Sequence, residues 1–106
     1  MASYEIYFDD RLGMNRPRLL VDYDSLSAEQ QQEFELKCQE ICSYIPERIK
    51  AFESRYMSYY EQLKEADDET FFLYNEEMNQ ISEIICDLNL LYLYIEGNFL
   101  NSTALA

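Results

Sequence analysis

The sequence contains no histidine, and only three of its 106 residues are cysteine. Zinc sites take most of their ligands from these two residue types, and no Cys-x-x-Cys pair is present, so we expect neither a metal site nor a disulfide framework. We predict instead that Cys38, Cys42 and Cys86 are small buried apolar residues in a reducing compartment. Because a glycine-rich phosphate loop, a nucleophile elbow and a Cys/His pair are also missing, we expect no enzyme activity and no cofactor.

Long apolar runs are missing too, and we expect no secretion signal. The longest apolar stretch, Leu90 to Ile95, is too short to span a bilayer, so we expect no membrane partner. The first ten residues already carry Glu5, Asp9 and Asp10, unlike a signal peptide, and we expect a cytoplasmic protein. Glycine and proline occur only twice each, while 15% of the residues are aromatic, which indicates one ordered domain.

What the sequence does have is one apolar stripe that folds back at the acidic run 65–69. Apolar residues recur every three or four positions, the spacing of a helix that pairs with another helix. The two halves of the stripe are Phe34, Cys38, Ile41, Ile45, Ile49, Phe52, Tyr56, Tyr59 and Leu63, then Phe71, Tyr74, Met78, Ile81, Ile85, Leu88, Tyr92, Ile95 and Phe99. We predict an all-α fold, a long antiparallel helical hairpin over residues 25–100. The pairs expected to meet are Leu63 with Phe71, Phe52 with Ile81, and Phe34 with Phe99.

The first helix has a clear start and an internal proline. The hydroxyl of Ser27 can cap the helix while Gln30 reaches back to the backbone of Ser27, which is a capping box. Pro46 falls inside the stripe, where it removes the backbone hydrogen bond to the Cys42 carbonyl. Since the stripe stays in phase across Pro46, we predict one long helix kinked there, with two separate helices as the alternative.

The second helix is bounded by an acidic start and a glycine. It should begin at Asp67 or Asp68 and run to about Glu96, because Gly97 and Asn98 are typical stop signals. Residues 101–106 are then expected to form a loose C-terminal tail.

The first two dozen residues, 1–24, have a different pattern from the helices. Apolar residues alternate with others over residues 4–8, and a second β-prone run, Leu19 to Tyr23, follows a loop that holds Gly13, Asn15 and Pro17. This predicts a β-hairpin or an extended N-terminal arm. Two strands alone are marginally stable, so the arm must pack either on its own helices or on a second copy. We expect its arginines to pair with carboxylates of the same protein; they are Arg11, Arg16 and Arg18.

The second half of the second helix is apolar on more than one side. A two-helix hairpin buries only one face of each helix, so these residues need another cover. The arm or a second copy can supply it, and we predict a four-helix homodimer. The residues of this self-association or client face are Ile84, Leu90, Leu91, Leu93 and Leu100.

The charge of the chain is −13 and unevenly distributed. All eight basic residues lie at or before Lys64, whereas nine acidic residues follow it. Such a field repels nucleic acid and steers the protein toward basic surfaces, which are common on nucleic-acid-binding proteins. The acidic residues predicted to bind a partner are Glu61, Glu65, Asp67, Asp68, Glu69, Glu76, Glu77 and Glu83, with Tyr56 and Tyr60 as aromatic contacts.

Two kinds of function fit these features. The first is a small acidic inhibitor or antagonist that occupies the basic surface of a nucleic-acid-binding protein, through the acidic turn or through the flank of the second helix. In expected shape and charge the chain resembles the small acidic helical proteins of phages and mobile elements, including nucleic-acid mimics and anti-defence proteins of the anti-CRISPR kind; the resemblance is one of composition and covers no motif. The alternative is a dimeric helical chaperone or adaptor that holds an apolar helix of a client, as small acidic secretion chaperones do.

Overall fold

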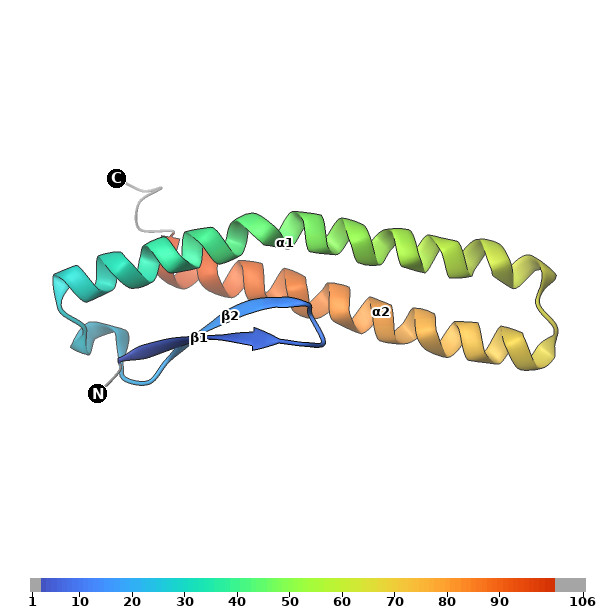
Figure 1. Ribbon diagram of the computed structural model, residues 1–106, viewed down its shortest axis with the longest axis horizontal. Helices are drawn as coiled ribbons and strands as arrows, with labels where there is room; N and C mark the ends of the chain where they lie inside the picture. Colours follow the sequence, from blue (N-terminus) through green and yellow to red (C-terminus); the bar gives the residue numbers. More distant parts are fainter. Residues whose placement is uncertain (1–2, 101–106) are drawn as a thin grey trace.

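The computed structural model describes residues 3–100, apart from the side chain of Leu100. Strands β1 (Tyr4–Asp9) and β2 (Met14–Leu19) form an antiparallel hairpin, and helices α1 (Ala28–Gln62) and α2 (Asp68–Ile95) form a long antiparallel pair. The molecule is elongated, 59 × 31 × 16 Å, and the β-hairpin lies beside the half of the helix pair that is distant from the α1–α2 turn (Figure 1). The predicted helical hairpin with an N-terminal β-hairpin is therefore confirmed.

Helix α1 begins as its capping pattern predicts. The Ser27 hydroxyl accepts a hydrogen bond from the Gln30 amide, and the Gln30 side chain accepts one from the Ser27 amide, both at 3.1 Å. The helix continues through Pro46 without interruption, so the alternative of two separate helices is wrong. Pro46 is exposed while its neighbour Ile45 is buried, and burial of the stripe on both sides of the proline compensates for the one lost backbone bond.

Helix α2 begins at the predicted place and ends at Ile95, within one residue of the predicted end, but a helical turn of another kind follows it. The Asp67 carboxylate accepts a hydrogen bond from the Thr70 amide at 2.8 Å, and α2 begins at Asp68. Instead of stopping at Gly97 and Asn98, the chain continues as a π-helical turn, Glu96–Leu100. This turn carries Phe99 into the core, and the burial of its ring outweighs the tendency of glycine to end a helix. The tail predicted for residues 101–106 lies outside the described residues.

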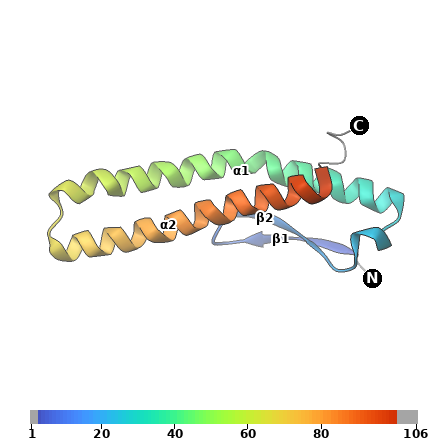
Figure 2. The same cartoon turned by 180° about the vertical axis from the view of Figure 1, so that it is seen from behind.

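The apolar stripe forms the core, and its packing changes along the hairpin. The rings of Phe34 and Phe99 meet edge to face at 5.0 Å, which confirms that predicted pair, and Phe52 and Ile81 are both buried in the same cluster. Near the α1–α2 turn the core is thinner, since Leu63 is only half-buried and Phe71 is exposed. The helix pair is therefore well packed in the half beside the β-hairpin. At the α1–α2 turn, where no β-hairpin lies beside the helices (Figure 2), its apolar side chains are poorly covered.

The turn of the β-hairpin differs from the predicted loop. Asn15 and Pro17 lie within β2, and the turn consists of residues 10–13. Pro17 is tolerated because each strand of a two-stranded sheet is an edge strand. Gly13 adopts a φ of +70°, a conformation that glycine accepts without strain, and donates to the Asp9 carbonyl at 2.8 Å. This tight turn places the side chain of Leu12 in the hydrophobic core, where it is 0% exposed.

The arginines of the β-hairpin pair with carboxylates of the same chain, as predicted. Arg11 contacts Asp87 of α2 at 2.6 Å, while Arg16 contacts Asp9 at 3.1 Å. The third pair, Arg18 with Glu5, joins the two strands at 2.9 Å. The contact from Arg11 ties the hairpin to the helices of its own chain, so the arm packs in cis.

Asp9 makes the β-hairpin sensitive to acid. Burial raises the pKa of Asp9, but hydrogen bonds from the Leu12 and Arg11 amides and from Arg16 outweigh it, and the net pKa lies below the usual value. A carboxyl whose pKa is lowered by folding stabilises the fold above its unfolded pKa, about 3.9, and loses that contribution as the pH falls through the folded pKa.

We therefore expect the wild-type protein to lose stability relative to an Asp9→Asn variant as the pH falls below about 4. The measurement is thermal unfolding of both proteins over this range, with the difference between the two curves as the readout. Subtraction removes the effect of the other carboxyls, whose protonation reduces the charge repulsion of both proteins equally. A difference that does not change with pH would contradict the role given to Asp9.

Candidate functional site

The acidic end of the molecule is formed by the α1–α2 turn and the first turns of α2. Most of the acidic residues predicted to bind a partner lie here, on the exposed surface, and Glu77 is half-buried. Glu83 does not belong to this group, because fifteen residues of helix place it about 22 Å along α2 from Asp68. We define the acidic tip by the residues that the structure brings together: Glu61, Glu65, Asp67, Asp68, Glu69, Glu76 and Glu77.

The negative charge of the acidic tip is not balanced by ion pairs. Within residues 3–100 the three ion pairs all involve arginines of the β-hairpin, and the nearby Lys64 takes part in none of them. Asp67 has a structural role, because its hydrogen bond from the Thr70 amide lowers the pKa of its carboxyl and caps α2. The other acids at the start of α2 also favour the positive end of the helix dipole, but they stay available to a partner.

An exposed apolar patch adjoins these acids, and sequence reasoning missed two of its residues. Phe72 is 70% exposed and Leu73 is 56% exposed, and both follow Phe71 at the start of α2. Three consecutive residues of a helix point in directions about 100° apart, so only one of them can follow the apolar stripe. The run Phe71-Phe72-Leu73 was therefore the signal that could have identified this patch.

The predicted aromatic contacts lie near the end of α1, where Tyr60 directly precedes Glu61 of the acidic tip and Tyr56 lies about one turn earlier. Tyr60 is exposed, but Tyr56 is half-buried and packs against the core, so only part of its ring can reach a partner. Tyr56 also lines a shallow groove of about 340 Å³ between α1 and α2, beside Met57 and Ile85. Tyr60 and Met57 thus extend the exposed apolar surface from the acidic tip along α1.

The face predicted for self-association or a client is smaller than expected. Leu90 and Leu93 are 57% and 63% exposed, as a contact face requires. Leu91 is only 5% exposed and belongs to the core, and Ile84 packs against the core, so both are covered within the chain. The side chain of Leu100 lies outside the described part of the structure.

The three cysteines do not share one environment. Cys38 and Cys42 are buried as predicted, and burial raises the pKa of the Cys38 thiol to about 12, so that this thiol stays protonated and unreactive. Cys86 is exposed on α2, and the prediction that it is buried is wrong.

The residues that the structure describes contain no cluster of three or more potential metal ligands from histidine, cysteine and the acids. None of the described helices is both long enough and apolar enough to cross a membrane. Comparison of the chain with models of protein families, with curated proteins and with solved structures finds no match. A function for this protein must therefore be inferred from its own surface.

Proposed function

We propose that this protein is a small acidic interaction module that binds the basic surface of a nucleic-acid-binding protein and acts as its inhibitor or antagonist. The observation that carries this proposal is the acidic tip, where exposed carboxylates without ion pairs in residues 3–100 adjoin the exposed side chains of Phe72 and Leu73. Charge alone attracts any basic surface, whereas an apolar patch inside a charged rim is typical of a specific interface.

The mechanism would be competition for the surface that binds nucleic acid. Carboxylates of the acidic tip take the place of phosphate groups and attract lysines and arginines of the partner. Phe72 inserts into an apolar part of that surface and supplies affinity that salt does not screen. The complex should therefore weaken with salt, because exposed charge pairs are screened beyond about 10 Å at 0.1 M ionic strength.

Charge reversal at the acidic tip tests this proposal. We expect the triple variant Asp68→Lys, Glu69→Lys and Glu76→Lys to lose a basic partner, since each change replaces an attraction by a repulsion. Asp67 is left intact because it caps α2. The measurement is affinity capture from the source cells with graded salt washes, followed by competition between this protein and DNA or RNA for the captured protein.

The matched control carries the same charge change at the other end of the molecule. Asp22, Asp24 and Glu29 are exposed and also lie at helix starts, so reversing them imposes a similar cost on stability. Full binding by this control and loss of binding by the tip variant would support the proposal. Equal binding by both variants, or a captured protein that still binds nucleic acid freely, would refute it.

A second candidate function is a dimeric helical chaperone or adaptor, and the exposure of Leu90 and Leu93 favours it. The double variant Leu90→Asp and Leu93→Asp should abolish capture of an apolar client and spare capture of a basic one. Leu36→Asp, at another exposed leucine on α1, is the control. Light scattering of the wild type and of the double variant shows whether the same leucines hold two copies together.

A further inference from the structure

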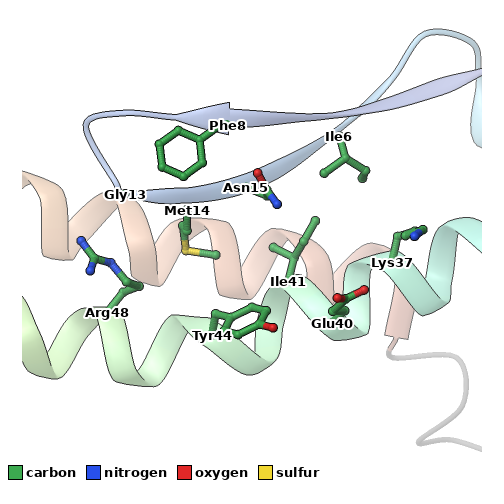
Figure 3. A pocket seen from close by; sticks show the side chains of 10 residues that line it. All are labelled: Ile6, Phe8, Gly13, Met14, Asn15, Lys37, Glu40, Ile41, Tyr44 and Arg48. Carbon is green, nitrogen blue, oxygen red and sulfur yellow. The ribbon is translucent and has the colours of Figure 1, made fainter.

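A cavity of about 350 Å³ lies between the β-hairpin and α1, away from the acidic tip (Figure 3). Its walls are largely apolar and come from Ile6, Phe8 and Met14 of the hairpin and from Ile41 of α1. Small-molecule sites have this character, with volumes of roughly 300–1,000 Å³ and a few polar groups among apolar ones. No pattern in the sequence predicts this cavity, because it exists only where the hairpin rests on the helix.

Arg48 is the polar group that distinguishes this cavity. Its Nε donates to the Leu12 carbonyl at 3.2 Å, and its guanidinium lies over the ring of Phe52, 5.0 Å from the ring centre. No carboxylate of the described residues forms an ion pair with Arg48, although the chain has many more acids than bases. The side chain is half-buried, so the unpaired charge is fixed in position at the edge of an apolar space.

The backbone beneath Arg48 is shaped to hold it there. Gly13 lies so close to the guanidinium that a Cβ at this position would come within 2.4 Å of the Nη2 atom. One edge of the guanidinium is thus held by the β-turn and one face by Phe52. A fork of donors held in this way binds a carboxylate or sulfonate with little further loss of side-chain entropy.

We propose that this cavity binds a small amphipathic organic anion, independently of the proposed function of the acidic tip. The anionic head binds Arg48, and the apolar body lies against Met14, Ile41 and Phe8. Lys37, at the far end of the opening in Figure 3, adds a second positive charge, while Glu40 adds one negative charge. The lining is therefore net positive in a protein whose total charge is −13, as a site for an anion requires.

A pair of fluorescent probes with one aromatic body tests the proposal on the wild-type protein. 8-Anilinonaphthalene-1-sulfonate carries the anionic head, and N-phenyl-1-naphthylamine is its neutral counterpart. We expect the anionic probe to bind and to be displaced by decanoate but not by 1-decanol. Amide chemical shifts should then change at residues 13–15 and 41–48. Displacement by 1-decanol as effective as by decanoate, or shifts confined to Phe72 and Leu73, would overturn the proposal.

Variants of two arginines provide the matched comparison. Arg48→Gln should weaken binding of the anionic probe roughly tenfold or more, the loss expected for a charge-assisted hydrogen bond, and leave the neutral probe unaffected. Arg55 is the control, because it lies on the same helix and over the same Phe52 ring, at 5.5 Å, without lining the cavity. Equal loss in Arg55→Gln would overturn the proposal. Near-ultraviolet circular dichroism of each variant excludes probe binding to a loosened core.

Discussion

Replacement of Phe34 by alanine is expected to lower the free energy of unfolding by about 3–5 kcal/mol, the usual cost of removing a buried aromatic ring. Phe34 lies where three elements meet. The centre of its ring is 5.1 Å from that of Tyr4 in β1, 5.0 Å from that of Phe99 and 6.4 Å from that of Tyr23. Each contact is an aromatic pair that adds to the apolar area buried. Because small domains have a total stability of about 5–15 kcal/mol, this one substitution removes a large part of it.

The measurement is chemical denaturation of the wild type and of Phe34→Ala, followed by circular dichroism. Phe72→Ala provides the control, since it removes the same ring from an exposed position, and we expect a change within about 0.5 kcal/mol. If Phe72→Ala were as destabilising as Phe34→Ala, then Phe72 would be covered in solution. That result would point to a second copy over the acidic tip.

The second large effect is expected for Leu12→Ala, which should lower the free energy of unfolding by about 2–5 kcal/mol. Leu12 is a turn residue, yet its side chain is fully buried in the core formed by the β-hairpin and the helices. Its backbone is also held on both sides, by the Asp9 carboxylate at the amide and by Arg48 at the carbonyl. Removing the side chain leaves a void under the turn, and the β-hairpin loses its main apolar anchor.

Hydrogen exchange of the β2 amides reports this loss directly. Exchange in Leu12→Ala should accelerate in β2 more than in α2, because the hairpin opens before the helix pair unfolds. Leu20→Ala is the control in the same arm, because the side chain of Leu20 is exposed. We expect it to change the free energy of unfolding by no more than about 0.5 kcal/mol. Unchanged exchange in Leu12→Ala would mean that the other contacts of the hairpin, such as buried Met14 and the ion pair between Arg11 and Asp87, hold it without Leu12.

The helices could be predicted from local signals because those signals lie within a few residues of each other. The Ser27 and Gln30 capping box and the Asp67 cap are formed by near neighbours in the chain. The pairing of the two halves of the apolar stripe could also be predicted from the sequence, as the contact of Phe34 with Phe99 shows. The π-helical turn after α2 was missed because Gly97 and Asn98 are local stop signals, and only the burial of Phe99 in the core continues the helical path past them.

The candidate surfaces were predictable only in part. Carboxylates at the α1–α2 turn stay on the surface in nearly any fold, so the acidic tip followed from the sequence. Exposure of apolar side chains depends on what covers them. Phe72 and Leu73 stay exposed because the β-hairpin lies beside the other half of the helix pair, and Leu91 is buried because of the chain packed beside it.

The sequence by itself determined the two helices, their caps, their antiparallel pairing and the uneven charge, because each of these depends on spacing or composition along the chain. Only the tertiary structure decided where the β-hairpin lies, and with it the burial of Leu12 and Leu91 and the cavity at Arg48. The physical reason is that these features arise from contacts between residues far apart in the sequence, such as Arg11 with Asp87 and Arg48 with Leu12. Periodicity within a segment carries no information about which distant surface will cover it.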